Sequence, residues 1–492
     1  MKGRSGPGAG TIGIAFVIAA AGCAAALPLC PAKGGPVWWE LTSDHFVLRT
    51  DLKPRAAMET LRTLEDARAG MLAGMWPGVV GPPGRTAAVA LASVSEAWAV
   101  TGTTSYAGMH VRLGPFPATL VVSPDDRSGR TAKHELAHEL ANYFLPVQPR
   151  WFAEGIATFL ATVRYDRAKG LSILGEADVQ YVRNFRLWGP SPFLELMAGT
   201  LPDDEVAATR FYATSWMLTN FLYNRRRAGW GNLQDRLGRL ERGHKAFMEE
   251  FPDLAPSRLA EVLRDHAAHG QYAVQVLPIP PWSGQARVRE MTDTEVHGLR
   301  AFLYWSMREG TSGITNEVIR TEIDESLRAD RPGLEALAVA FYAEEVAYPR
   351  SHSDLAALAV RAHPDHWMAW LMSAEARSPD APERMSDLRR ALQLAPRAPW
   401  VLGELAEIEA REERWSNVLR YTNLDLAAGT TYPELWILHL AAARATGHCP
   451  EAELWAFALR SYLPRTYAAR LGAAQRIPCG ATAPSPSKPL SQ

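Results

Sequence analysis

Two hydrophobic periods alternate along the first quarter of the chain. Residues 45–49 and 86–92 are short runs rich in apolar and β-branched side chains, which is typical of strands. Residues 54–76 instead carry apolar side chains three and four positions apart, which predicts a helix. Another strand-like run, residues 118–123, precedes the next helical stretch. We therefore predict an α+β segment over residues 37–123.

Helical periodicity dominates the rest of the chain. A hairpin is expected around Ala168-Lys169-Gly170, and residues 193–269 have a helical pattern in which His266 and His269 are expected at the surface. The run 277–284 is too rich in proline for a helix and separates two regions.

Beyond this break, three similar stretches contain Trp367, Trp400 and Trp436, which are 33 and 36 residues apart. This spacing is close to the period of about 34 residues found in tetratricopeptide helix pairs. We predict a tetratricopeptide-like solenoid, which offers a surface for a protein partner.

The N-terminus has the pattern of an export signal. Lys2 and Arg4 precede an apolar run, residues 11–21, that is shorter than a membrane span. The run ends in Ala20-Ala21-Gly22-Cys23, which resembles a bacterial lipoprotein box. This resemblance implies that Cys23 is lipid-modified and anchors the protein to a membrane of the cell envelope. The alternatives are ordinary signal-peptidase cleavage near residues 24–26, giving secretion, and an uncleaved anchor; each of them exports the protein.

Length, net charge and cysteine content limit the number of domains, the class of partner and the compartment that we expect. The chain has 492 residues, of which 47% are hydrophobic, enough for two or three domains. A formal net charge of −1 gives no electrostatic reason to expect nucleic acid. Cys449 and Cys479 form an even pair near the C-terminus that suits a disulfide in an oxidising compartment, although two unrelated thiols would have the same pattern.

The candidate chemistry lies in the helical stretch His134-Glu135-Leu136-Ala137-His138. Residues four apart share a helix face, so His134 and His138 can present two nitrogens to one metal ion. Glu135 lies one position further round the helix, where it can reach a water on the metal as a general base. No cysteine lies near. The alternative is a helix with two incidental histidines.

A third ligand is expected on the next helix. Pro149 suits its first turn, and Glu154 lies within Trp151-Phe152-Ala153-Glu154-Gly155-Ile156-Ala157. Three protein ligands and one open position are typical of catalytic zinc, whereas structural zinc usually has four ligands. The ligand-bearing faces otherwise carry small residues, which allow the two helices to approach closely: Ala137, Ala141, Ala157, Thr158 and Ala161.

Together these two motifs resemble the gluzincin metallopeptidases, in particular the bacterial peptidase MA-like families. The resemblance covers about residues 37–275. It implies one Zn²⁺ bound by His134, His138 and Glu154, with Glu135 as general base. Many gluzincins carry an acidic residue four positions after the glutamate ligand, where it holds a ligand histidine; here that position is Thr158.

The resemblance also suggests how substrate is bound. In gluzincins an edge strand over the metal binds the substrate backbone, and residues 105–111 are our candidate for it, with an ordinary hairpin strand as an equal alternative. Related enzymes use Tyr or His to donate to the oxyanion, which makes Tyr212 a candidate, with core packing as the alternative.

We therefore expect an α+β zincin-like catalytic domain followed by an all-α tetratricopeptide-like solenoid. The predicted segments are a lipoprotein-type signal peptide 1–22, a linker 23–36, the metallopeptidase domain 37–275, a proline-rich linker 276–295, the helical domain 296–470 and a tail 471–492. The expected function is zinc-dependent hydrolysis of peptide bonds in a peptide or protein substrate at the cell envelope. The alternatives are a non-catalytic envelope scaffold that binds a partner through its repeats, and a zinc hydrolase with a non-protein substrate.

Overall fold

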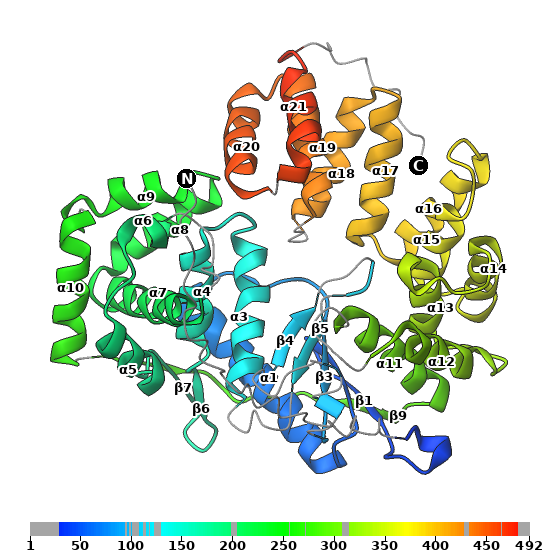
Figure 1. The fold of residues 1–492 in the computed structure, drawn as a ribbon, viewed down its shortest axis with the longest axis horizontal. Helices are drawn as coiled ribbons and strands as arrows, with labels where there is room; N and C mark the ends of the chain where they lie inside the picture. Colours follow the sequence, from blue (N-terminus) through cyan, green and yellow to red (C-terminus); the bar gives the residue numbers. More distant parts are fainter. Residues whose placement is uncertain are drawn as a thin grey trace, which may run out of the picture.

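The structure is a computed structural model that describes most of the chain between residues 29 and 480 (Figure 1). The described residues are 29–93, 96–97, 100, 108–111, 115–117, 119–122, 129–197, 204–254, 256–270, 272–307, 314–427, 432–463 and 465–480. The predicted signal peptide with Cys23, the first half of the predicted edge strand (105–107) and the end of the tail lie outside them.

Six of the described strands form a mixed sheet in the order β4-β5-β3-β2-β1-β9. Their bounds are Trp39–Thr42 (β1), Phe46–Thr50 (β2), Thr86–Ala90 (β3), Gly108–Val111 (β4), Thr119–Val122 (β5) and Arg287–Glu290 (β9). The central strands β2, β3 and β5 run parallel, and β4, β1 and β9 pair antiparallel to their neighbours. The predicted α+β segment is confirmed.

Both faces of this sheet are covered, which explains why every side chain of β5 is buried. Leu120 and Val122 pack into a core with α1 (Pro54–Met75) and α3 (Arg130–Phe144). Val121 points to the opposite face, where it packs with residues of α11 (Asp293–Met307) and α13 (Leu334–Tyr342). The first helices after the proline-rich break are therefore part of the sheet's second layer.

A second group of helices surrounds α4 (Arg150–Leu160). They are α5 (Val179–Trp188), α6 (Phe193–Met197), α7 (Glu205–Arg225), α8 (Arg227–Gly238), α9 (Gly243–Glu250) and α10 (Pro256–His269). His266 of α10 is buried and faces Asn220 of α7, with Nε2 2.9 Å from Oδ1, so its expected surface position was wrong. A polar partner inside the core compensates the burial of the imidazole.

The predicted hairpin around residues 168–170 is confirmed. It is formed by β6 (Arg164–Asp166) and β7 (Leu171–Leu174), and β8 (Gln275–Pro278) adds a third described strand. The expected linker 276–295 thus contributes strands to both sheets, the end of β8 to this one and β9 to the large one. Between them, the backbone N–H of Trp282 donates to Asp66 of α1 at 3.0 Å, which holds this segment against the first domain.

The remaining helices form an arc beside and above the sheet (Figure 1). They are α12 (Asn316–Leu327), α14 (His352–Ala362), α15 (Trp367–Glu375), α16 (Pro382–Leu394), α17 (Pro399–Arg411), α18 (Trp415–Leu426), α19 (Pro433–Ala445), α20 (Cys449–Tyr462) and α21 (Ala468–Arg476). We call residues 293–476 the helical arm. Three of its helices, α15, α17 and α19, begin at or beside the tryptophan stretches that recur in the sequence.

The end of the helical arm returns to the first domain. Residues of α19 and α20 share a hydrophobic cluster with Val147, which lies between α3 and α4, and with Leu240. Arg242 lies over the ring of Phe457 on α20, 5.3 Å from its centroid. The predicted disulfide between Cys449 and Cys479 is present and fastens the residues after α21 to the start of α20. Among the described residues, no helix is both long and apolar enough to cross a membrane.

Candidate metal centre

The two predicted ligand helices lie side by side. α3 ends at Phe144, just before Pro146, and Pro149 is the N-cap of α4. The small residues expected between them are buried: Ala137 and Ala141 on α3, and Ala157 on α4. Without larger side chains in the interface, the helix axes come close enough for ligands from both helices to meet.

His134, His138 and Glu154 converge as predicted. Nε2 of His134 lies 3.1 Å from Nε2 of His138. Oε2 of Glu154 lies 3.5 Å from the first of these nitrogens and 3.6 Å from the second. The rings of the two histidines are nearly perpendicular, at 84°. Two nitrogens and one carboxylate oxygen thus form a small triangle.

This triangle fits a zinc ion. Zinc binds nitrogen and oxygen at about 2.0–2.1 Å, and tetrahedral geometry then places neighbouring ligand atoms about 3.3 Å apart. The three measured separations, 3.1, 3.5 and 3.6 Å, bracket this value. The donor set suits the same metal, because imidazole and carboxylate are common ligands of zinc.

The ligands differ in exposure. The side chain of Glu154 is 3% exposed, whereas those of His134 and His138 are 19% and 17% exposed. Burial alone would raise the pKa of Glu154, but interactions with His134, His138 and Arg150 outweigh burial and hold this pKa well below its usual range. Glu154 is therefore a buried anion that faces two histidines. The more exposed side of the triangle is therefore the side of the two histidines.

Glu135 is half-buried beside the triangle. Burial raises its pKa to about 7, and the charge of Glu154 adds to this increase, while His134 and Arg150 oppose it. A pKa in this range allows the carboxyl group to exchange a proton near neutral pH. A group that exchanges protons in this range is suited to general acid–base work.

Arg150 is a residue of the site that the sequence reasoning missed. Its guanidinium donates to Oε1 of Glu154 at 2.8 Å, which leaves Oε2 to face the histidines. A signal was present, because Arg150 precedes Glu154 by one helical turn on the same face. Thr158, at the position where many gluzincins have an acidic residue, donates its hydroxyl to the backbone carbonyl of Glu154 at 2.6 Å.

Tyr212 lies half-buried on α7, a helix that packs against α4 and α5. On α5, Tyr181 lies under the guanidinium of Arg130, 5.2 Å from the ring centroid. Burial raises the pKa of Tyr181 to about 12, with smaller contributions from charges that include Tyr212 and Glu154. Tyr212 thus lies on a helix that packs against the helix of Glu154, and its role as an oxyanion donor stays a prediction.

The predicted edge strand is β4. It pairs antiparallel with β5 on one side and is the last strand of the large sheet within the described part of the chain. α3 packs against it, so this edge lies next to the helix that carries both histidines. Such an edge presents unpaired backbone groups to an extended peptide.

The chain matches no protein-family model and no curated protein.

Proposed function

We propose that this protein is a zinc-dependent metallopeptidase of the gluzincin type, in which His134, His138 and Glu154 hold one zinc ion. The observation that carries the proposal is the triangle of two imidazole nitrogens and one carboxylate oxygen, spaced 3.1–3.6 Å apart, with a glutamate beside it. Three protein ligands leave a position open, as in catalytic zinc sites.

In the proposed reaction, each side chain around the zinc site has a separate role. A bound zinc ion would supply Lewis acidity, which makes water a nucleophile near neutral pH and polarises a carbonyl group. Glu135 accepts the proton of the attacking water and transfers it to the nitrogen of the leaving amine. Arg150 keeps Glu154 oriented, and Tyr212 is the candidate donor to the oxyanion.

Peptide substrates are favoured by the neighbouring sheet edge. An extended peptide added to β4 would form backbone hydrogen bonds and lie along α3, beside the two histidines. Backbone pairing holds the scissile peptide without requiring particular side chains. A non-protein substrate would make no use of this edge.

We further propose that the enzyme works outside the cytoplasm, tethered to a membrane through lipid on Cys23. The helical arm is proposed to be a tetratricopeptide-like solenoid that binds a protein partner or substrate. Its successive helix pairs, α15–α16, α17–α18 and α19–α20, and the return of α19–α20 to the loop between the ligand helices support this arrangement.

A peptide-library digestion tests the proposal. Purified, zinc-loaded protein is incubated with peptides of mixed sequence, and the products are identified by mass spectrometry. We expect cleavage of internal peptide bonds that stops with a chelator and returns when zinc is added. An intact library, from protein shown to contain zinc at His134 and His138, would refute the peptidase function.

A further inference from the structure

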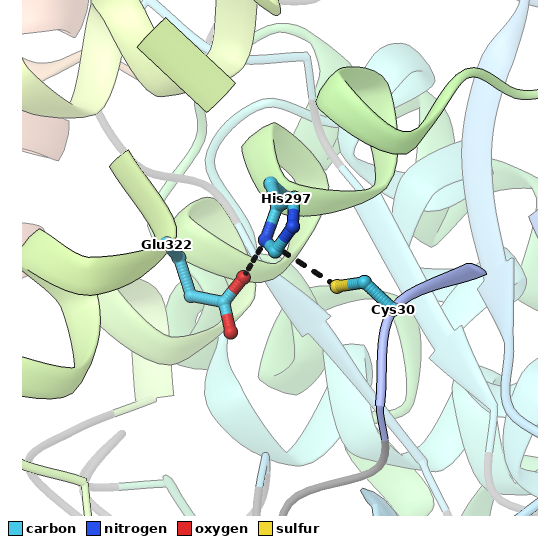
Figure 2. Close-up of side chains that lie close together, drawn as sticks. All are labelled: Cys30, His297 and Glu322. Atoms are coloured by element: carbon cyan, nitrogen blue, oxygen red, sulfur yellow. Dashed lines mark hydrogen bonds and ion pairs between the residues drawn. The ribbon is translucent and has the colours of Figure 1, made fainter. Parts of the chain in front are cut away.

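A second cluster of metal-ligating side chains lies on the other side of the large sheet. Cys30, His297 of α11 and Glu322 of α12 converge from three separate segments, as Figure 2 shows. Nδ1 of His297 lies 3.3 Å from Sγ of Cys30 and 2.5 Å from Oε2 of Glu322. Cys30 and His297 are 2% and 3% exposed. A thiol, an imidazole and a carboxylate thus meet in the protein interior.

A carboxylate also lies on the other side of the same histidine. Its Nε2 is 3.3 Å from Oδ2 of Asp293, an ion-pair distance without hydrogen-bond geometry, and Oδ1 of Asp293 accepts from the backbone N–H of Ala32 at 2.9 Å. Histidines that bind metals almost always present their second ring nitrogen to a carboxylate, carbonyl or water, which fixes the ring. Nδ1 is the nitrogen that faces Cys30 and Glu322, and Asp293 is the carboxylate nearest to Nε2.

The sulfur also has a supporting partner. Arg300 donates to Sγ of Cys30 at 2.9 Å, and its remaining nitrogens bind Glu96 at 3.0 and 3.1 Å. Apart from the ion pair of Arg300 with Glu96, three acidic groups lie around His297: the thiol of Cys30 and the carboxyl groups of Glu322 and Asp293. The buried hydroxyl of Tyr304, one turn after Arg300, has no hydrogen-bond partner among the described residues.

We propose that Cys30, His297 and Glu322 bind a second divalent transition ion, of which zinc is the best match to one sulfur, one nitrogen and one oxygen ligand. Zinc places such neighbouring ligand atoms about 3.3 to 3.6 Å apart. The sulfur–nitrogen separation of 3.3 Å is within about 0.3 Å of the value for that pair, and the carboxylate of Glu322 would withdraw from its 2.5 Å hydrogen bond by about 1 Å. Binding would require Cys30 to coordinate as the thiolate.

The geometry argues against a nucleophilic cysteine at this place. In a cysteine–histidine–acid relay, one ring nitrogen accepts the thiol proton and the other donates to the acid. Here Sγ and the carboxylate of Glu322 both face Nδ1, so a single nitrogen would have to perform both tasks. Cys30 is also too buried to meet a substrate.

The ion would cross-link the N-terminal segment to the helical arm. Cys30 lies just before a short 3-10 helix, Pro31–Lys33, while His297 and Glu322 belong to the helical arm. Lys33 forms an ion pair with Glu325 of α12 at 2.7 Å across the same junction, but this exposed pair contributes little. A bound ion would hold the start of the described chain against the arm much more firmly, since metal binding adds directly to folding stability.

Cobalt titration tests this site independently of the peptidase proposal. The full chain carrying Cys23→Ser is used, because the change removes the competing thiol, and the disulfide of Cys449 and Cys479 offers no thiolate. Cobalt(II) bound by a thiolate has a strong charge-transfer band in the near ultraviolet. The first centre contains no sulfur, so this band reports the second site alone.

We expect two cobalt equivalents and the thiolate band in the Cys23→Ser protein. Adding His138→Ala should remove one equivalent and leave the band, whereas adding Cys30→Ser should remove one equivalent together with the band. A His138→Ala protein that binds cobalt without the band, or binds none, overturns the second site even if Cys30→Ser fails to fold. Loss of the first centre alone would instead leave one equivalent with the band.

Discussion

Arg150 and Glu154 form an ion pair within one turn of α4, with a guanidinium nitrogen 2.8 Å from Oε1 of the carboxylate. The other oxygen of the same carboxylate faces both histidines. Arg150 therefore leaves Oε2 of Glu154 to face the proposed metal and restrains the carboxylate against rotation. It performs from α4 a supporting task like the one that an acidic residue performs in many gluzincins.

Replacing Arg150 tests this role. Arg150→Gln should weaken zinc binding by about 10- to 100-fold, the usual cost of removing a group that orients a ligand. Zinc affinity is measured by competition with a chromophoric chelator. Arg164→Gln is the control, because Arg164 makes an ion pair with Glu176 and touches no ligand. Equal zinc affinity in Arg150→Gln and the wild type would show that the ion pair has no orienting role.

Glu135→Gln separates metal binding from catalysis. The amide has the shape of the carboxylate but cannot accept a proton, so peptide hydrolysis should fall by about 100- to 10,000-fold. Zinc content should stay at the wild-type level, since Glu135 is not one of the ligands. Both are measured on the same preparation, by peptide cleavage and by elemental analysis. Near-normal turnover in a zinc-replete variant would remove Glu135 from the mechanism.

Substitutions of the proposed ligands should instead remove the zinc ion itself. His138→Ala and Glu154→Ala are each expected to lose one zinc equivalent relative to the wild type. They should also lose the rise in Tm that this equivalent provides, because an ion that binds only the folded state stabilises it by mass action. Thermal scans with and without zinc measure the effect. If Glu154→Ala retains wild-type zinc affinity, another residue supplies the third ligand.

Local patterns predicted the first centre because its parts are close in the sequence. His134, Glu135 and His138 share one helix, and Glu154 follows on the next, so spacing and a loop of ordinary length were enough. Strands β2, β3 and β5 and the hairpin at residues 168–170 were also predictable, since period and turn residues are local signals. The parallel order of β2, β3 and β5 is a tertiary feature that such signals do not contain.

The cluster of Cys30, His297 and Glu322 could not be predicted from the sequence, because its members are far apart along the chain. Cys30 and His297 are separated by 267 residues and meet only because α11 covers the far face of the sheet. His266 was misplaced because its buried partner, Asn220, lies on a different helix. Strand β9 was hidden in a stretch whose prolines favoured a linker, yet Arg287–Glu290 pair with β1 in full register.

The membrane tether is testable with two matched cysteines. Cys23→Ser should move the protein from the membrane fraction to the soluble fraction or block its processing, because a lipoprotein's acyl chains provide the anchor. Cys30→Ser, only seven residues further along, should leave the protein in the membrane fraction. Fractionation followed by mass spectrometry of the mature N-terminus measures both. Recovery of unmodified Cys23 in a soluble mature protein would favour secretion instead.

Gly155 allows α4, which carries the proposed ligand Glu154, to lie close against α7. A Cβ atom at this position would lie 2.2 Å from Oγ1 of Thr219 and 2.8 Å from the backbone oxygen of Ser215. The backbone contact cannot be relieved by a side-chain rotation, so Gly155→Ala should force the helices apart. Overpacking of this kind costs about 1–3 kcal/mol of unfolding free energy. Because Glu154 is the adjacent residue, zinc affinity should fall as well.

Gly231 provides the matched control for this prediction. It lies exposed on α8, and a Cβ atom there would meet no heavy atom within 4 Å. Gly231→Ala should therefore stabilise the protein by roughly 0.5–1 kcal/mol, since alanine is the better helix former, and leave zinc affinity unchanged. Denaturant unfolding and chelator competition compare the two variants. Gly155→Ala with wild-type stability and zinc affinity would mean that the α4–α7 contact does not set the position of Glu154.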